Sequence, residues 1–479
     1  MDVRKFDVVV IGGGPGGYVC AIRAAQLGFK VAVIEREALG GVCLNWGCIP
    51  TKALLRAAEI RRLVAHADEF GLKVEDKGFD FAKVIARSRE VAGKLSKGVE
   101  FLMKKNKIEV LRGEAAFSGD KELEVRGVGK VAFDYAVIAT GARAKQIKGV
   151  LEADGKLIWT AREAMVPPEM PASLLVVGGG AIGVEFASFY AALGCKVTLV
   201  EAQGRIVPAE DEEISALLKK ELEKAGIEIV VGAKVESLGS QEPGARNQDV
   251  SVVINGEKRR FARAILAIGV VGNVEGLNLP APKMGHSGKA EGGVVVEKAA
   301  IVVDDFYRTA SPHIYAIGDV AGAPWLAHVA SHEGVIAAEH MAFVAKKAGH
   351  LPHPLRYDNI PGCTYCMPQV ASTGLTEAVA VAAGRKIKVG RYAYQANGKA
   401  LALGEPTGMV KVIFDAATGE LLGAHILGAE ATEMISTFVL GRSVEAVEAD
   451  FIHACLPHPT LSEMMGEAVL SAEGRVINA

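Results

Sequence analysis

Two cysteines near the N-terminus have the type and spacing to do redox chemistry. Cys43 and Cys48 lie within residues 40–52, which read GGVCLNWGCIPTK. On a regular helix, residues five apart have α-carbons separated by about 8–9 Å, whereas a disulfide needs less than about 7 Å. The helix must therefore be interrupted if the thiols are to bond, and Gly47 and Pro50 are residues that can interrupt it. A bridge in such a turn is a candidate for repeated opening and closing, and two buried structural cysteines are the alternative.

Composition limits the classes of protein that this chain can belong to. The 479 residues have room for about three domains. Half of the residues are hydrophobic, so sizeable cores are possible, and a net charge of −2 gives no argument for nucleic acid or a membrane surface. The long, nearly uncharged stretch from Leu174 to Gly194 contains three consecutive glycines and Glu185, which favour a strand, a turn and a helix over a membrane span.

Cysteine usage indicates the compartment. The chain has seven cysteines, and its first residues run straight into an apolar strand without a secretory leader. This combination predicts a cytoplasmic protein in a reducing environment, where a disulfide is more often catalytic than structural.

A repeated glycine pattern organises the chain. Each copy follows a β-like apolar run, precedes small residues at helical spacing, and leads to a second apolar strand that ends in an acid. The two copies are Gly12, Gly14, Gly17 and Glu35, and then Gly178, Gly180, Gly183 and Glu201. In dinucleotide-binding units the glycines bring a pyrophosphate close to the helix N-terminus, and the acid accepts hydrogen bonds from ribose hydroxyls. Two glycine-rich turns without ligands are the alternative.

Two nucleotide sites predict two cofactors. Because the thiols follow the first site, we expect FAD there and a nicotinamide nucleotide in the second. Glu201 favours NAD over NADP, since a carboxylate would repel a ribose phosphate, although Arg205 lies nearby in the sequence.

The predicted fold class is α/β, with two Rossmann-like dinucleotide-binding domains followed by a C-terminal α+β domain. We expect the FAD domain to begin at residues 1–150 and to resume at 276–347. The nicotinamide domain is expected at 151–275, and the mixed C-terminal domain at 348–479. Two similar strands that end in glycine, Tyr135–Gly141 and Ala264–Gly269, close the two nucleotide-binding segments.

These motifs together resemble the pyridine nucleotide-disulfide oxidoreductases, and among them the dihydrolipoyl dehydrogenase family, over essentially the whole chain. The resemblance implies that Cys43 and Cys48 form the redox-active disulfide. It also implies that Asp319, in the segment 309–319, binds the ribityl chain of the flavin. The cofactor-binding residues that it implies are Gly12, Gly14, Gly17, Glu35, Lys52, Ala115, Thr140, Gly141, Asp319, Leu326, Ala327, His328, Gly178, Gly180, Gly183, Glu185, Glu201 and Gly269. Lys52 and Glu185 resemble an ion pair at the reactive edge of the flavin.

Near the C-terminus, His458 and Glu463 resemble the family's catalytic histidine and the glutamate that orients it. The chemistry also calls for such a base, because a free thiol with a pKa near about 8.5 is mostly protonated at neutral pH. An imidazole can take that proton, and a carboxylate on its other nitrogen fixes the tautomer. Pro459 is expected in the first turn of a helix that carries Glu463. A surface or structural histidine is the alternative.

Family architecture implies a homodimer in which the C-terminal domain is the interface. His458 of the partner subunit would then serve the disulfide, with Cys43 exchanging with substrate and Cys48 facing the flavin. The implied reaction is oxidation of dihydrolipoamide to lipoamide with reduction of NAD. The implied partner is a lipoyl domain, either of a 2-oxoacid dehydrogenase acyltransferase or of the glycine cleavage carrier protein.

Several residues depart from the family pattern. Trp46 and Thr51 stand where relatives often have a small aliphatic residue and serine, and Leu456 stands where many have histidine. Cys363 and Cys366 form a CxxC pair that is expected to be structural, although a redox or metal role stays open. The other cysteines are expected to pack or to be structural: Cys20, Cys195 and Cys455.

The chief alternative function is that of a glutathione reductase or a related disulfide reductase. Glu201 opposes it, because an NADPH enzyme should offer basic residues there. Ile22 also opposes it, because glutathione reductases resemble one another in carrying arginine at that point. A mercuric reductase is less favoured, since the chain ends without a cysteine pair. From a different class, the chain could be chiefly an assembly subunit of a dehydrogenase complex.

Overall fold

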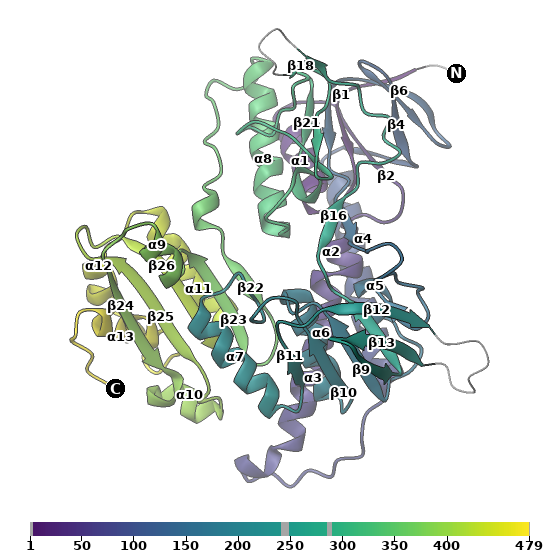
Figure 1. Ribbon diagram of the computed structural model, residues 1–479. Coiled ribbons are helices and arrows are strands. Elements are labelled where there is room, and N and C mark those ends of the chain that lie inside the picture. The colour runs from purple at the N-terminus through teal and green to yellow at the C-terminus, as the bar shows by residue number, and fades with distance from the viewer. Residues whose placement is uncertain (1–2, 241–248, 285–289, 479) are drawn as a thin grey trace. The chain divides into compact units, whose positions relative to one another are not determined.

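The structure is a computed structural model that describes residues 3–240, 249–284 and 290–478. The chain forms two units, each an α/β arrangement (Figure 1). Unit 1 comprises residues 1–53, 83–145 and 270–355, and unit 2 comprises residues 54–82, 146–269 and 356–479. No helix within the described ranges is both long enough and apolar enough to cross a membrane.

Unit 1 is built on a seven-stranded sheet in the order β3-β2-β1-β6-β5-β4, with β21 paired to β6. The neighbours β3, β2, β1, β6 and β21 are parallel, and β5 and β4 continue antiparallel. Its strands are β1 (Arg4–Ile11), β2 (Val31–Glu35), β3 (Glu109–Arg112), β4 (Ala115–Gly119), β5 (Glu122–Val125), β6 (Gly129–Ile138) and β21 (Ile314–Ala316). Continuous runs such as Val8–Ile11 suit these parallel strands because both faces of the sheet are covered.

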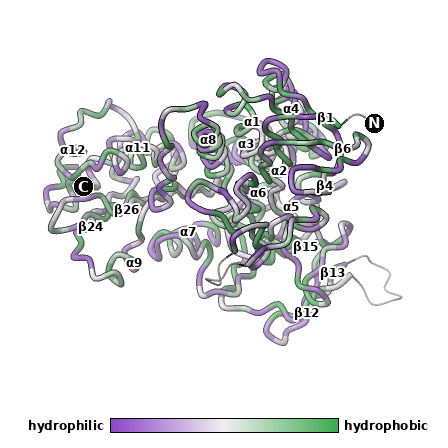
Figure 2. Tube along the Cα trace, turned by 90° about the horizontal axis from the view of Figure 1, so that it is seen from above, coloured by the Kyte–Doolittle hydropathy of each residue, from purple (hydrophilic) through white to green (hydrophobic). Residues whose placement is uncertain are grey.

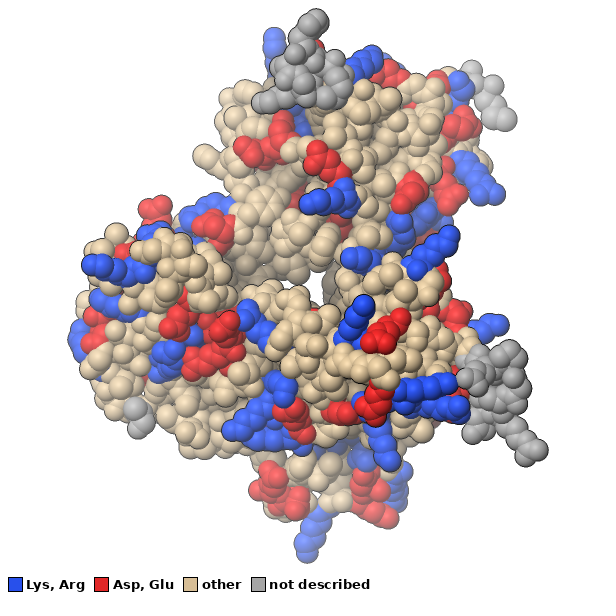
Figure 3. Space-filling model, viewed as in Figure 1, with Lys and Arg blue, Asp and Glu red and all other residues tan. Residues whose placement is uncertain are grey.

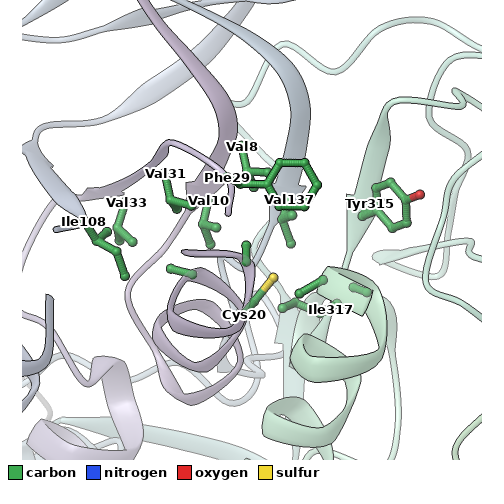
Figure 4. Packing of buried hydrophobic residues seen from close by; sticks show 14 of the residues in the cluster. Val8, Val10, Cys20, Phe29, Val31, Val33, Ile108, Val137, Tyr315 and Ile317 are labelled. Carbon is green, nitrogen blue, oxygen red and sulfur yellow. The ribbon is translucent and has the colours of Figure 1, made fainter. Parts of the chain in front are cut away.

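The helices of unit 1 pack on one face of this sheet. In Figure 4 the strand side chains Val10 and Val33 lie on the side of the sheet where Cys20 of the first helix also lies. The first helix, α1 (Pro15–Gln26), and α8 (Ala327–Val344) approach closely through glycines. A Cβ on Gly334 would lie 2.6 Å from the carbonyl oxygen of Gly16, so only glycine permits this contact.

The other elements are short, except for two long helices that contain residues of both units. They are α2 (Gly41–Trp46), α3 (Cys48–Ala65), α4 (Phe81–Lys105), β7 (Ala142–Ala144), β16 (Val270–Gly272), β17 (Lys283–Met284), β18 (Ala290–Gly292), β19 (Val296–Glu297), β20 (Ala300–Ile301) and the 3₁₀ turn η2 (Gly318–Ala321). The antiparallel pairs among these strands are β16 with β7, β17 with β18, and β19 with β20.

Unit 2 contains a second parallel sheet in the order β11-β10-β9-β15-β8. It is formed by β8 (Ile158–Trp159), β9 (Ser173–Val177), β10 (Lys196–Val200), β11 (Glu228–Val230) and β15 (Arg263–Leu266), with α5 (Ala161–Ala164), α6 (Ala181–Ala192), α7 (Glu212–Lys224) and the 3₁₀ turn η1 (Ala67–Phe70) in the same unit. A separate antiparallel sheet holds β12 (Val235–Ser240), β13 (Val250–Ile254) and β14 (Glu257–Phe261). The stretch Leu174–Gly194 is thus strand β9, a turn and helix α6, as predicted.

The C-terminal part of unit 2 is a five-stranded antiparallel sheet in the order β22-β23-β26-β25-β24. Its elements are β22 (Gly362–Thr364), β23 (Gln369–Gly374), β24 (Ile387–Ala393), β25 (Met409–Asp415), β26 (Leu421–Gly428), α9 (Glu377–Ala382), α10 (Gly398–Leu403), α11 (Ala431–Ser443), α12 (Glu448–His453), α13 (Glu463–Ala472), η3 (Tyr357–Asn359) and η4 (Tyr394–Ala396). Buried side chains of α11 and α13, including Phe438 and Met464, share one core cluster with Phe414 of β25. Sheet and helices therefore form a mixed α+β body, and the predicted fold class is confirmed.

One buried lysine ties α7 to the C-terminal sheet within unit 2. Lys411 of β25 is 2% exposed, and its Nζ lies 2.8 Å from Asp211 and 2.7 Å from Glu377. Burial opposes ionisation of Asp211, yet hydrogen bonds from Lys411 and from the Glu377 N–H hold its pKa below the usual value. Hydrophobic and hydrophilic colours alternate along α7 in Figure 2, as expected of a helix with one buried face.

Replacing Lys411 with methionine is expected to lower the free energy of unfolding by about 3–5 kcal/mol, because it leaves the Asp211 carboxylate buried and uncompensated. The matched control is Lys388→Met. Lys388 also binds two carboxylates but is 34% exposed, so its loss should cost much less than the loss of Lys411. Urea unfolding followed by circular dichroism measures both, and equal costs would contradict this account.

Charged side chains are mixed over the faces of the units that Figure 3 shows, with lysine and arginine next to aspartate and glutamate rather than gathered by sign. Many of them are paired, for example Arg259 with Glu228 at 2.6 Å and Lys130 with Glu122 at 2.8 Å. Such a surface fits the near-zero net charge.

Candidate active site and cofactor sites

The cysteine segment is a helix interrupted between its two thiols. Helix α2 ends at Trp46, Gly47 takes φ −152° and ψ −118°, and α3 begins at Cys48. The carbonyl of Gly47 then accepts hydrogen bonds from the hydroxyl of Thr51 at 2.8 Å and from its N–H at 3.1 Å. The predicted interruption at Gly47 is confirmed, and Pro50 lies in the first turn of α3, where its missing N–H costs nothing.

The interruption brings the two sulfurs into contact. Both thiols are partly buried. The hydrogen bond to Cys48, together with burial, raises the pKa of the Cys43 thiol, while the Lys52 cation lowers it. Cys48 is the first residue of α3, where unpaired N–H groups and the helix dipole favour an anion such as a thiolate.

The buried surroundings of two other cysteines disfavour the thiolate, which is the reactive form of the side chain. Burial raises the pKa of the Cys20 thiol to about 12 and that of the Cys195 thiol to about 12. Both therefore pack as small apolar residues, as predicted. The Sγ of Cys366, which is buried, donates to the carbonyl of Pro368 at 3.0 Å. A role for the Cys363 and Cys366 pair beyond structure stays open.

The first glycine motif forms a tight β1–α1 turn. A Cβ on Gly17 would lie 1.9 Å from the carbonyl oxygen of Gly12, so the helix could not approach the strand with any other residue there. The Glu35 carboxylate, at the end of β2, accepts hydrogen bonds from the N–H of Gly13 at 2.8 Å and of Glu37 at 2.7 Å. These two bonds use one lone pair on each oxygen and leave others for ribose hydroxyls. The turn fits the FAD nucleotide.

Further residues expected to bind FAD gather at the same edge of the sheet. Thr140 and Gly141 follow β6, whose Ile138 pairs with Ile11 of β1. Strand β21, also paired with β6, leads into the turn that holds Asp319. Burial raises the pKa of the Asp319 carboxyl to about 6. A partly desolvated carboxyl at this edge fits a hydrogen bond to a flavin hydroxyl.

A hollow of about 480 Å³ lies beside Glu35. Its lining is mostly polar and charged: Arg36, Glu37, Gly113, Glu114 and Arg126. The predicted residue Ala115 begins β4 directly after this lining. No local sequence pattern joins the end of β2 to the turn before β4, so the sequence alone could not predict that these five residues line one hollow. The same holds for Glu333 of α8, which accepts a hydrogen bond from the Gly318 N–H at 2.5 Å.

The predicted FAD contacts at the start of α8 lie together. Leu326 is the residue preceding the helix, and Ala327 and His328 are its first two residues. Their N–H groups belong to the helix N-terminus, which favours a negatively charged or polar ligand group.

The second glycine motif repeats the first almost atom for atom. A Cβ on Gly183 would lie 1.9 Å from the carbonyl oxygen of Gly178, and the Glu201 carboxylate accepts from the N–H groups of Gly179 and Gln203, each at 2.7 Å. Gly269, at φ +105°, follows β15 as Gly141 follows β6. The turn fits a second dinucleotide.

One basic and one acidic residue near this motif are hydrogen-bonded to protein groups outside the motif. Arg205, the basic residue near the ribose carboxylate, binds Glu212 at 2.6 Å and the Pro208 carbonyl at 3.0 Å. Glu185 of α6 accepts from the backbone N–H of Tyr365 at 2.9 Å. The ion pair expected between Lys52 and Glu185 stays a prediction.

His458 and Glu463 form a hydrogen-bonded pair at the end of the chain. The His458 Nδ1 lies 2.9 Å from the Glu463 Oε1, and the other carboxylate oxygen accepts from the Thr460 N–H at 2.8 Å. The Thr460 bond, and then the His458 bond, lower the pKa of Glu463. The imidazole is 81% exposed, so its Nε2 is open to a reactant.

The position of Pro459 corrects a prediction. We expected it in the first turn of the helix, but α13 begins only at Glu463 and Pro459 precedes it. The pair forms because the first residue of α13 reaches back to Thr460 and His458, as an acidic side chain does at a helix N-terminus.

Comparison with known proteins identifies the family. The model of the pyridine nucleotide-disulphide oxidoreductases matches residues 6–334, and the model of that family's dimerisation domain matches residues 360–469. The chain belongs to the pyridine nucleotide-disulphide oxidoreductases. As a member of this family it is an oxidoreductase whose cofactors are FAD and NAD, and the matching C-terminal segment supports a homodimer.

Individual relatives match over nearly the full length. A dihydrolipoyl dehydrogenase of Rhizobium etli is 49% identical, covering 99% of this chain and 100% of its own. One from Zymomonas mobilis is 50% identical, with 99% of each chain covered. Among solved structures, the flavoprotein disulfide reductase RclA from Escherichia coli, in a Cu(II) complex, has a TM-score of 0.84 at 27% identity, covering 98% of this chain and 99% of its own.

Proposed function

We propose that this oxidoreductase is a dihydrolipoyl dehydrogenase that oxidises dihydrolipoamide to lipoamide and reduces NAD. The observation that carries the proposal is the interruption of the helix at Gly47, which places Cys43 and Cys48 in hydrogen-bond contact beside the FAD motif. Full-length similarity to enzymes of that name supports it. We place the activity in the cytoplasm, because a disulfide that must cycle needs a compartment in which thiols persist.

In the first half of the reaction, a base makes the substrate thiol a nucleophile. His458 of the partner subunit takes the proton of one dihydrolipoamide thiol at Nε2. The resulting thiolate attacks the Sγ of Cys43, the disulfide breaks, and Cys48 leaves as a thiolate stabilised by the N-terminus of α3. A mixed disulfide between the substrate and Cys43 remains.

In the second half, the other substrate thiolate attacks the mixed disulfide and releases lipoamide. Cys43 and Cys48 are then reduced by two electrons, and the substrate has lost two electrons and two protons. FAD, when bound, supplies the route by which that electron pair passes from Cys48 to NAD. Glu463 fixes the tautomer of the His458 imidazole. Because the Glu463 carboxylate is hydrogen-bonded to Nδ1, Nε2 is the atom that takes the proton.

The partner that presents the substrate is proposed to be a lipoyl domain of a 2-oxoacid dehydrogenase acyltransferase or of the glycine cleavage carrier protein. The exposed His458 suits a substrate group that arrives on another protein, because a lipoyl group reaches the site on a long, flexible arm. We also propose the domain division into residues 1–150, 151–275, 276–347 and 348–479, and the roles given above to the individual site residues.

A paired assay separates this function from that of a glutathione reductase. One sample of the purified flavoprotein receives dihydrolipoamide and NAD, and the other receives oxidised glutathione and NADPH, with NADH and NADPH followed by absorbance. The proposal expects NADH to form in the first and no NADPH to be consumed in the second. The reverse pattern would overturn both the substrate and the coenzyme assignment.

Glu201 is expected to set the choice of NAD over NADP. In Glu201→Gln the amide oxygen still accepts from a backbone N–H, but the charge that repels a ribose phosphate is gone. The ratio of kcat/KM for NAD to that for NADP should fall about tenfold, the equivalent of one charge-assisted hydrogen bond.

The matched control is Glu35→Gln, which makes the same change at the same place in the first glycine motif. It is expected to weaken FAD retention and to leave the coenzyme ratio unchanged. If both variants shifted the ratio equally, Glu201 would not be the determinant.

A further inference from the structure

Helix α4 is attached to the backbone of the cysteine segment on both sides of Gly47. The Ser96 hydroxyl donates to the Leu39 carbonyl at 2.9 Å, just before α2. An Nη of Arg89 donates to the Asn45 carbonyl at 2.6 Å, near the end of α2, and an Nη of Arg87 donates to the Ala53 carbonyl at 3.2 Å, within α3. All of these residues belong to unit 1. One helix thus holds both pieces of the interrupted helix.

Arg89 makes the attachment closest to the interruption. The last carbonyls of a helix lack partners within it, so a cation there satisfies an acceptor and opposes the negative end of the dipole. The Arg89 guanidinium also lies over the Trp46 ring, 4.2 Å from its centroid. Trp46 is the last residue of α2, directly before Gly47. Arg89 therefore contacts the final two residues of α2, one through a hydrogen bond and the other through a cation–π contact.

Trp46 is held on its other side as well. Its indole N–H donates to the Glu37 carboxylate at 3.1 Å. The N–H of Glu37 in turn donates to the Glu35 carboxylate at 2.7 Å. A continuous path of contacts thus joins the acid that would bind the FAD ribose to the end of α2. The Trp46 indole makes a hydrogen bond to Glu37 and a ring contact with Arg89, and a small aliphatic side chain could make neither.

We propose that Arg89 is a positioning residue for the Cys43–Cys48 couple, acting through the Trp46 ring and the Asn45 carbonyl. The proposal rests on the redox role proposed above for these cysteines. A disulfide tolerates α-carbons no more than about 7 Å apart, which is less than a continuous helix provides. By fixing the end of α2 beside the start of α3, Arg89 holds the two thiols close together and so raises the effective concentration of each thiol near the other.

The expected consequence is a change in the redox equilibrium of the couple. Oxidation joins the two Sγ atoms and releases two protons and two electrons, which a dithiothreitol redox buffer accepts as its own disulfide is reduced to the dithiol. Freeing the end of α2 favours the separate thiols over the bridge. Loss of Arg89 should therefore lower the equilibrium constant for disulfide formation about tenfold, which raises the midpoint potential by about 30 mV.

The experiment titrates the holoenzyme against oxidised and reduced dithiothreitol and counts alkylated Cys43 and Cys48 by peptide mass. The variants are Arg89→Met, Arg89→Lys and Trp46→Phe. Lysine keeps a donor but lacks the planar group that stacks, and phenylalanine keeps a ring but lacks the N–H. The control is Lys97→Met, which removes a charge from the same helix. Lys97 is exposed, and within the described ranges its side chain has no hydrogen bond or ion pair.

The proposal expects the largest rise in potential in Arg89→Met, smaller rises in Arg89→Lys and Trp46→Phe, and none in Lys97→Met. If Arg89→Met does not retain flavin, the Arg89→Lys and Trp46→Phe results decide. Unchanged potentials in the folded variants, or an equal rise in Lys97→Met, would overturn it. If the wild-type pair itself did not titrate as a dithiol–disulfide couple, the proposed function would fail instead.

Discussion

Cys48→Ser is expected to lower turnover of dihydrolipoamide with NAD by at least about a thousandfold, while the protein still folds and holds FAD. A serine oxygen cannot form the bridge or leave as a stabilised thiolate at the start of α3, so Cys43 has no disulfide to offer the substrate. When catalytic residues act as one unit, removal of any one of them costs the enzyme nearly all of its activity. Steady-state NADH formation measures the effect.

The matched control is Cys455→Ser. Cys455 is an exposed thiol and lies close in sequence to His458, yet it has no part in the exchange, so its variant should turn over normally. Substantial turnover in Cys48→Ser would mean that electrons reach FAD without the Cys43–Cys48 bridge. A chain that served only to assemble a complex would show no loss in either variant, because neither would have activity to lose.

His458→Ala is the second large effect, an expected fall in turnover of about 10²–10⁴-fold, the usual contribution of a positioned proton acceptor. Without the imidazole, the substrate thiol must lose its proton to solvent before it can attack Cys43. The side chain is 81% exposed, so its removal should cost little folding stability. Added imidazole should restore part of the lost rate, because a small base can enter the space that the side chain leaves.

His453→Ala controls for the loss of an exposed histidine in the same region, since His453 ends α12 and is not hydrogen-bonded to a carboxylate in the described structure. Its turnover should match that of the wild type. Equal losses in the two variants, or no rescue of His458→Ala by imidazole, would argue that the His458–Glu463 pair acts only in folding.

Local pattern predicted the parts of this molecule that a short segment determines by itself. The two glycine turns require small residues because a Cβ would strike the backbone of the same turn, as at Gly17 and Gly183. The interruption at Gly47 followed from the reach of a disulfide compared with the pitch of a helix. In each case, the contact that fixes the structure lies within a few residues of the motif.

Contacts between distant segments could not be predicted in this way. Arg89 and the Asn45 carbonyl are 44 residues apart, and Lys411 and Asp211 are 200 apart. Nothing in their neighbouring residues marks them as partners, because the contact exists only once the helices and sheets have packed. Pro459 shows the limit at short range: its residue type fits a first helical turn, but α13 starts later, at the residue whose carboxylate binds His458 and Thr460.

The most direct measurement is an anaerobic single turnover without NAD. The oxidised flavoprotein receives one equivalent of dihydrolipoamide, is quenched with an alkylating agent and is analysed by peptide mass. We predict that lipoamide forms and that new alkylation appears at Cys43 and Cys48, with Cys20, Cys195 and Cys366 unchanged. Lipoamide formation without new alkylation of that pair in the course of the reaction, or new alkylation at Cys363 and Cys366 instead, would contradict it.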